Sequence, residues 1–141
     1  MRKHWGWGNA DQAPTAEQIA EAAPGIATML GFGRMEPEQP VELSEAVLPQ
    51  PRVEPGELRD LADDGAHARA THAMGKAYRD VVRAFRGDFS TAPDFVARPA
   101  TDVDVERILL WAQDRNVAVI PYGGGTSVVG GVEPRGLDDF D

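Results

Sequence analysis

The sequence predicts an α+β fold in which a helical leader precedes a strand, a helix, a second strand and a loop. Apolar residues recur at helical spacing in two long segments, and the β-branched run Val117–Pro121 follows the second of them. The 141 residues are 42% hydrophobic and 26% charged, which is typical of a globular protein of one domain. With so few strands, we expect the sheet to be incomplete.

The leader is expected to cover residues 1–93 and to begin with a short helix, residues 15–23. Thr15 and Gln18 have the spacing of a capping box, and Pro24 followed by glycine is expected to end the helix. Residues 36–56 contain five prolines, which predicts an extended connector because proline lacks an N–H and disfavours helix before it. A further short helix is expected over residues 55–65.

A longer amphipathic helix is predicted from about His72 to Arg86. Its apolar residues fall three and four positions apart, which places them on one face. These residues are Met74, Ala77, Tyr78, Val81, Val82 and Phe85. Gly87 is expected to end the helix.

The second unit is expected to cover residues 94–141. Residues 94–99 predict a short strand, and Thr101, with Asp104 three positions later, predicts a capped helix that ends near Asn116. One face of that helix is expected to carry Val105, Ile108, Leu109 and Ala112. Residues 117–121 are apolar throughout, which predicts a strand covered on both faces and parallel to the first. The tail RGLDDFD predicts no completed element.

Composition excludes several classes of protein. The net charge is −9, and no basic face is evident that could bind nucleic acid or an anionic membrane surface. The absence of cysteine excludes disulfides, thiolate metal sites and a cysteine nucleophile. No stretch approaches the roughly 20 apolar residues that span a bilayer, and no secretory signal is evident, so we expect a cytoplasmic location.

A glycine-rich loop, PYGGGTSVVGG, is the strongest functional signal. No residue from Asn116 to Val132 is charged, so a phosphate would meet no carboxylate there. Glycine admits close approach to backbone N–H groups, which can bind phosphate oxygens. The hydroxyl groups of Thr126 and Ser127 add further donors. The alternative is a glycine-rich turn that joins two strands. The loop lacks the lysine of a P-loop and the spacing of a Rossmann fingerprint.

The segment VAVIPYGGGTSVVGGVEP resembles the first flavin-binding segment of FAD-linked oxidases with a PCMH-type domain, also called the vanillyl-alcohol oxidase type. The upstream segments HAMGKAYRDVVRAFRGDFSTAPDFV and HWGWG are similar to the branch that contains alkyldihydroxyacetonephosphate synthase. The resemblance implies that residues 94–141 are the truncated start of such a domain. It also implies that Pro121–Ser127 wrap the FAD pyrophosphate, that Val128–Gly131 follow the cofactor, and that FAD is held non-covalently because the loop has no histidine. The cofactor-binding residues that the resemblance implies are Pro121, Tyr122, Gly123, Gly124, Gly125, Thr126, Ser127, Val128, Gly130 and Gly131.

Three functions therefore stand as alternatives. The first is the N-terminal part of an FAD-dependent oxidoreductase or alkylglycerone-phosphate synthase-like enzyme that acts on a small molecule. This chain alone is then expected to be inactive, and no catalytic residue is assigned. The second is a non-enzymatic module that pairs with a separately encoded remainder. The third is a phosphate-binding protein that uses the loop without flavin.

Other residues have both a functional and a structural interpretation. Trp5 and Trp7 could cover a cofactor, but we expect them to anchor the N-terminus; Trp111 is expected to cover a sheet edge. Four polar residues could face an anionic group or form a solvated helix face, namely Arg69, His72, Lys76 and Tyr78. The three histidines, His4, His67 and His72, lack the spacing of a metal site, and no metal is expected.

Overall fold

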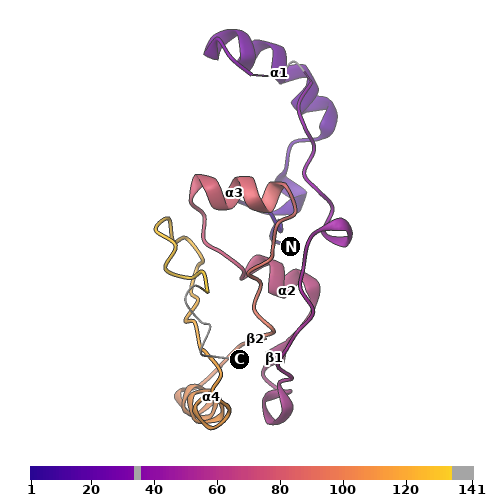
Figure 1. The fold of residues 1–141 in the computed structure, drawn as a ribbon. Helices are drawn as coiled ribbons and strands as arrows, with labels where there is room; N and C mark the ends of the chain where they lie inside the picture. Colours follow the sequence, from indigo (N-terminus) through magenta and orange to yellow (C-terminus); the bar gives the residue numbers. More distant parts are fainter. Residues whose placement is uncertain (34–35, 135–141) are drawn as a thin grey trace.

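The computed structural model describes residues 1–33 and 36–134. It confirms the α+β class: helices dominate and one small sheet is formed (Figure 1). The elements in chain order are η1 (Ala10–Gln12), α1 (Ala16–Leu30), η2 (Leu43–Glu45), η3 (Gly56–Leu58), β1 (Ala62–Asp63), α2 (Ala66–Thr71), α3 (Tyr78–Phe85), β2 (Val96–Ala97) and α4 (Asp102–Arg115). In Figure 1, α1 and α4 lie at opposite ends, with α2 and α3 between them. The tail from residue 135 lies outside the described residues.

The first helix begins as expected and ends later than expected. Thr15 and Gln18 form the capping box, with Gln18 N–H donating to Thr15 Oγ1 over 3.2 Å. The expected break at Pro24 is wrong, because α1 continues to Leu30 and ends at Gly31, whose φ is 72°. Proline removes one hydrogen bond to the carbonyl four residues earlier. That carbonyl belongs to exposed Ala20, where water can replace the lost donor.

The expected helix over residues 55–65 is also wrong. A single 3₁₀ turn, η3, is followed by β1, which pairs antiparallel with β2, Ala62 opposite Ala97. Arg98 N–H extends the pairing with a 2.9 Å bond to the Leu61 carbonyl. The pairing partner lies 35 residues away in the sequence, so local pattern alone does not indicate this strand.

The expected helix from His72 to Arg86 is formed only in part. Its first section is non-helical, and α2 and α3 are separate helices on either side of residues 72–77. Met74 is buried as expected, whereas Tyr78 is 86% exposed. Long-range contacts with the glycine loop, described below, hold the intervening segment in its non-helical path.

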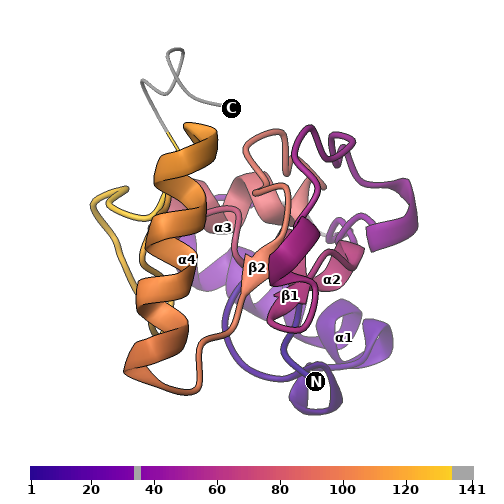
Figure 2. The same ribbon diagram turned by 90° about the horizontal axis from the view of Figure 1, so that it is seen from below.

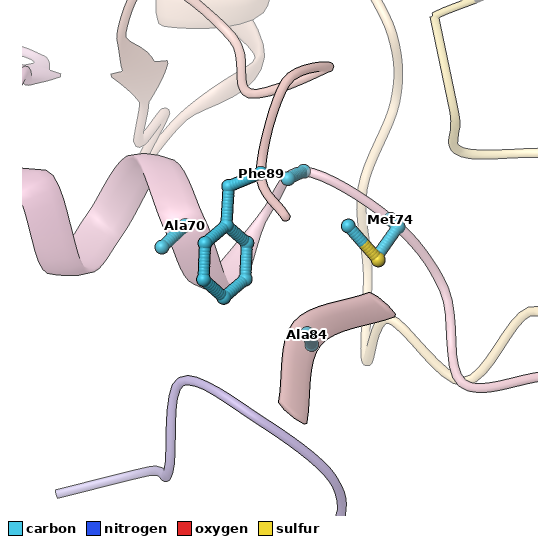
Figure 3. Packing of buried hydrophobic residues seen from close by; sticks show 5 residues of the cluster. Ala70, Met74, Ala84 and Phe89 are labelled. Atoms are coloured by element: carbon cyan, nitrogen blue, oxygen red, sulfur yellow. The ribbon is translucent and has the colours of Figure 1, made fainter. Parts of the chain in front are cut away.

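Two apolar clusters form the core. The first lies between α2, α3 and the connector, with Phe89 fully buried at its centre against Ala70, Met74 and Ala84 (Figure 3). The connector reaches this cluster as an extended chain: Val47 N–H donates to Gly87 O over 2.7 Å. The second cluster gathers under α4 and consists of Leu58, Ile108, Trp111 and Ala112.

The helix α4 confirms the expected cap and end. Asp104 N–H donates to Thr101 Oγ1 over 3.2 Å, and Asn116 ends the helix with φ 55°. The expected apolar face is only half correct. Ile108 and Ala112 are buried with Trp111, whereas the other two members, Val105 and Leu109, are 43% and 52% exposed. Trp111 instead packs edge-on against Phe95, with ring centroids 5.7 Å apart.

Residues 117–121 form no strand in the described part of the chain, so the expected second strand and its parallel pairing are wrong here. Val117 packs against the cluster under α4, but Val119 is 43% exposed. A run of this composition needs neighbouring strands for its backbone hydrogen bonds, and the described residues supply none to it. Figure 2 shows the chain continuing along the side of α4 opposite to β1 and β2.

Candidate functional site

The glycine-rich loop, residues 121–131, lies against the non-helical segment between α2 and α3. Ser127 O accepts a 2.7 Å hydrogen bond from Lys76 N–H. Tyr122 Oη lies 2.9 Å from Thr71 O and 3.2 Å from Met74 O, so the phenol donates to carbonyls at the end of α2 and in the segment that follows it. Burial raises the pKa of Tyr122, which keeps the phenol protonated as this donor. The loop is therefore fastened at two points to a segment about 50 residues earlier.

Two glycines are required by the closeness of these contacts. A Cβ on Gly75 would lie 2.1 Å from Ser127 O, well inside any tolerable contact. A Cβ on Gly125 would lie 2.2 Å from the Tyr122 hydroxyl, and Gly125 also has φ +68°, a conformation that favours glycine. Gly123 and Gly124 meet no such obstacle, so their packing inside this chain does not require glycine.

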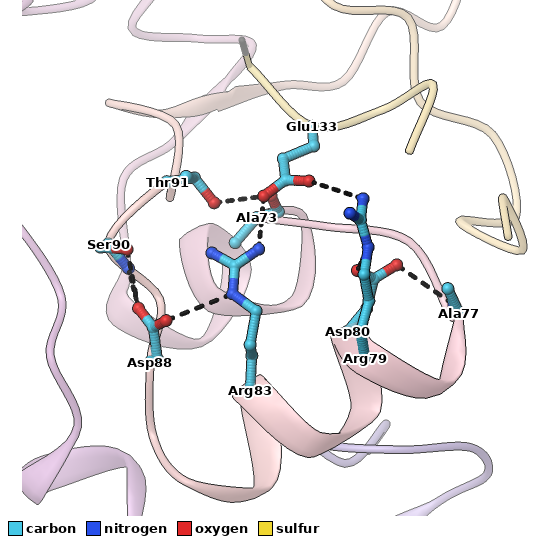
Figure 4. Close-up of polar contacts among 9 residues, drawn as sticks. All are labelled: Ala73, Ala77, Arg79, Asp80, Arg83, Asp88, Ser90, Thr91 and Glu133. Atoms are coloured by element: carbon cyan, nitrogen blue, oxygen red, sulfur yellow. Dashed lines mark hydrogen bonds and ion pairs between the residues drawn. The ribbon is translucent and has the colours of Figure 1, made fainter. Parts of the chain in front are cut away.

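An ionic cluster fixes the chain just after the loop (Figure 4). The Glu133 side chain is only 4% exposed and pairs with Arg79, 3.3 Å away, and with Arg83. The hydrogen bond to Glu133 raises the pKa of Arg83. Asp88 lies 3.2 Å from Arg83 on the other side. Asp80 accepts from Ala77 N–H over 3.1 Å and caps the start of α3.

Sequence reasoning missed this cluster. Arg79 and Arg83 are four residues apart, which places both on one face of α3. That spacing was the available signal. Their partner lies 50 or more residues later, and nothing local in the sequence indicates it.

Residues 123–126 of the loop carry backbone N–H donors that have no acceptor within the described part of the protein. Among the described residues, no protein oxygen accepts from the N–H groups of Gly123, Gly124, Gly125 or Thr126. Gly123, Gly124 and Thr126 are exposed. Ser127 serves the loop itself, because its hydroxyl accepts from Gly131 N–H over 3.2 Å. Consecutive backbone N–H groups of this kind bind anionic oxygens.

A cavity of about 260 Å³ lies between this loop and the N-terminal segment, residues 1–9. The loop contributes Tyr122, Gly124 and Thr126, and the N-terminal segment contributes Trp7 and Asn9 among others. The residues of the loop expected to bind the cofactor that do not line the cavity are Pro121, Gly123, Gly125, Ser127, Val128, Gly130 and Gly131. Of these, Gly125 and Ser127 hold the loop in shape.

The N-terminal segment is folded back against the body of the protein. Trp5 packs edge-on against Phe85 with centroids 5.3 Å apart, and His4 Nε2 donates to Val41 O over 2.9 Å. Trp5 therefore acts as the expected anchor. Trp7 is different, because it lies at the cavity and is 54% exposed.

The structure assigns different roles to the four polar residues that could face an anionic group or form a solvated helix face. Arg69 is structural: it is buried and donates to Pro93 O and Pro49 O over 2.7 and 2.6 Å. Tyr78 is exposed. His72 donates from Nδ1 to Ala68 O over 2.7 Å and packs against the Tyr122 ring, 4.5 Å between centroids. Burial lowers the pKa of His72, which favours the neutral ring.

Lys76 is the one of these four that lines the cavity. It follows Gly75, and its N–H holds Ser127, so its side chain leaves the backbone at the point where the loop is fastened. Within the described residues, no three His, Asp or Glu side chains come together as a metal site. None of the described helices is both long and apolar enough to cross a membrane.

Comparison with known proteins gives one consistent result. No family model matches the chain. The chain is 44% identical to the alkyldihydroxyacetonephosphate synthase of Trypanosoma brucei brucei over 98 residues, which is 66% of the chain and 16% of that protein. It is 42% identical to the enzyme of the same name from Dictyostelium discoideum over 83 residues, 59% of the chain and 14% of that protein.

Solved structures agree with the sequence relatives. Two crystal structures of alkyldihydroxyacetonephosphate synthase superpose on 98% of the chain, with TM-scores of 0.77 and 0.75 and identities of 25% and 26%. The chain covers 31% of each of these structures. It therefore spans about a sixth of the curated relatives and about a third of the solved chains.

Proposed function

We propose that this chain, which belongs to the alkyldihydroxyacetonephosphate synthase-like branch of the FAD-linked oxidases, binds the pyrophosphate of FAD through the loop Pro121–Gly131. One observation carries the proposal. The N–H groups of residues 123–126 have no protein acceptor among the described residues, and they lie in a loop without charge beside a cavity. Such a loop matches an anionic oxygen better than it matches a turn between strands, because residues 117–121 form no strand here.

In this proposal some residues of the loop contact the pyrophosphate and others hold the loop in shape. Gly123 and Gly124 have no Cβ, so a pyrophosphate oxygen can approach their N–H groups closely. Thr126 adds a hydroxyl donor at the cavity wall. Gly125, Ser127 and Tyr122 hold the loop in the shape that presents these donors. Since no acid lies between Asn116 and Val132, no carboxylate repels the bound group.

FAD is held without a covalent bond in this proposal, because the loop contains no histidine to attach it. When bound, FAD would supply the electron-transfer chemistry of the complete enzyme. The described residues of this chain bind and orient the cofactor, and none is assigned to the chemical step.

The activity of the whole protein is proposed by relationship. The named relatives are alkyldihydroxyacetonephosphate synthases, and this chain covers only a small part of each. We propose that a protein containing this segment is an FAD-linked oxidase, dehydrogenase or alkylglycerone-phosphate synthase-like enzyme acting on a small molecule. This chain alone is expected to bind FAD weakly and to turn nothing over.

A fluorescence titration tests the loop. Purified chain is titrated into FAD, with riboflavin as the probe that lacks the pyrophosphate. Gly124→Asp is expected to abolish FAD binding, because it puts a carboxylate at the cavity wall. Val129→Asp is the matched control: it adds the same charge to the same loop at a residue that is 89% exposed and does not line the cavity. Equal binding of FAD and riboflavin, or equal loss in both variants, would refute the loop as the pyrophosphate site.

The second candidate function is a non-enzymatic module that pairs with another polypeptide. Exposed apolar side chains on α4 favour it: Val103 is 67% exposed and Leu110 is 55% exposed. Such a face is costly to leave in water. Co-purification of the chain with a second polypeptide, released by Leu110→Lys, would support this function. A monodisperse folded monomer with no partner would exclude it.

A further inference from the structure

The cavity beside the glycine loop is positively charged in a protein that is strongly negative. Three cationic residues line it, Arg2, Lys3 and Lys76, and no Asp or Glu does. The chain as a whole has a net charge of −9. A cluster of one sign in a chain of the opposite sign indicates a ligand of opposite charge.

These cations are not used for ion pairs within the described chain. The ion pairs among the described residues all join other side chains, and none of Arg2, Lys3 and Lys76 lies within ion-pair distance of a carboxylate. Lys3 lies over the Trp5 ring, 4.5 Å from its centroid, which positions it without neutralising it. Burial lowers the pKa of Lys76 most, the nearby Arg2 and Lys3 lower it further, and the Asp80 carboxylate opposes them in part. The positive charges therefore converge on one place.

The N-terminal segment that carries two of these cations is held in place. The Arg2 carbonyl accepts from His67 Nε2 over 2.8 Å, and Lys3 N–H donates to Gly8 O over 3.2 Å. Gly6 and Gly8 have φ values of 63° and 83°, so the turn between them needs glycine. The segment thus forms a fixed wall of the cavity.

We propose that the N-terminal segment Met1–Asn9 is the second half of an anion site, in which Arg2, Lys3 and Lys76 neutralise a phosphate or diphosphate bound by the loop. This rests on the proposed function, in that the loop amides bind the same oxygens. The loop supplies donors without charge, and the facing wall supplies charge. The shared chemistry is a phosphate oxyanion, which could come from the dinucleotide or from a smaller phosphate.

The test uses the full chain with a carboxy-terminal tag, which leaves Arg2 and Lys3 unaltered. The probes are FAD, inorganic pyrophosphate as a competitor, and inorganic phosphate. Lys76→Gln and Arg2→Gln remove one positive charge each, and Lys76→Arg keeps the charge. Arg86→Gln is the matched control, because Arg86 is exposed and does not line the cavity. A thermal melt of each variant establishes that it is folded.

The site predicts that Lys76→Gln and Arg2→Gln each weaken binding of FAD and pyrophosphate roughly tenfold or more, whereas Lys76→Arg and Arg86→Gln bind as the wild type does. Competition by phosphate alone, without pyrophosphate preference, would assign the site to a smaller phosphate. Wild-type FAD affinity in folded Lys76→Gln and Arg2→Gln would overturn the inference and leave the proposed function standing. Pyrophosphate binding without FAD binding would keep the anion site and overturn the proposed function. No binding of any probe would overturn both.

Discussion

Replacement of Gly75 by alanine tests whether the glycine loop is fastened to the segment between α2 and α3. The new Cβ would lie 2.1 Å from Ser127 O, whereas ordinary contact begins near 3.4 Å. The two backbones must separate by more than about 1 Å, which is costly in a packed interior. The 2.7 Å bond from Lys76 N–H to Ser127 O is then lost.

The expected destabilisation follows from three effects. Forced overpacking costs about 1–3 kcal/mol. The lost hydrogen bond costs about 1 kcal/mol net. Alanine reduces the entropy of the unfolded chain, which returns about 0.4–1 kcal/mol. The free energy of unfolding is therefore expected to fall by about 1–3.5 kcal/mol, and Tm by roughly 3–14 °C for a chain of this size.

Gly123→Ala is the matched control for this prediction. A Cβ there meets nothing within 4 Å, so the free energy of unfolding is expected to stay the same or to rise by up to about 1 kcal/mol. Its FAD binding should weaken, because in the proposed site a phosphate oxygen approaches the Gly123 N–H and the added methyl group would crowd it. Urea unfolding followed by circular dichroism, together with the flavin titration, measures both. Equal stability of the two variants would refute the fastening of the loop at Gly75.

Three further perturbations have defined outcomes. Glu133→Gln should lower the free energy of unfolding by about 1–3 kcal/mol, because the side chain is 4% exposed and Arg79 and Arg83 each lose one of their two carboxylate partners. Asp114→Asn, at an exposed carboxylate, should change the free energy of unfolding by less than about 0.5 kcal/mol in the same urea titration. Phe89→Ala should lower the free energy of unfolding by about 3–5 kcal/mol in the same assay, because Phe89 is fully buried. Tyr78→Ala should change the free energy of unfolding little, because the Tyr78 side chain is 86% exposed. Burial lowers the pKa of His72 below its ordinary 6.5, so the unfolded chain binds the proton more readily than the folded chain does. The free energy of unfolding should therefore fall as the pH is lowered below 6.5. In melts between pH 7 and 5, His72→Gln should show a smaller fall than the wild type, and identical pH profiles would contradict this prediction.

Features with local causes could be predicted from the sequence. The caps at Thr15 and Thr101 depend on residues three positions apart, and both formed. The end of α4 at Asn116 was predicted from the end of the helical apolar pattern, which is also a local feature. The loop was found because its composition, glycine without charge, is itself local.

Features with distant causes could not be predicted. The helix expected through Gly75 is interrupted because Ser127, 52 residues later, approaches that backbone. The lining of the cavity brings Arg2 together with Lys76 and Thr126, and no spacing in the sequence predicts that these three residues lie side by side. At Pro24 the local signal predicted a helix end that does not occur, because an exposed helix tolerates the proline.

The most direct test of the central claim is a residue-resolved one. The amide resonances of Gly123, Gly124, Gly125 and Thr126 are followed by nuclear magnetic resonance while FAD is added, with riboflavin in a parallel titration. The account predicts that FAD shifts these four amides together and that riboflavin leaves them unmoved. FAD binding that shifts other amides and leaves these four in place would contradict it.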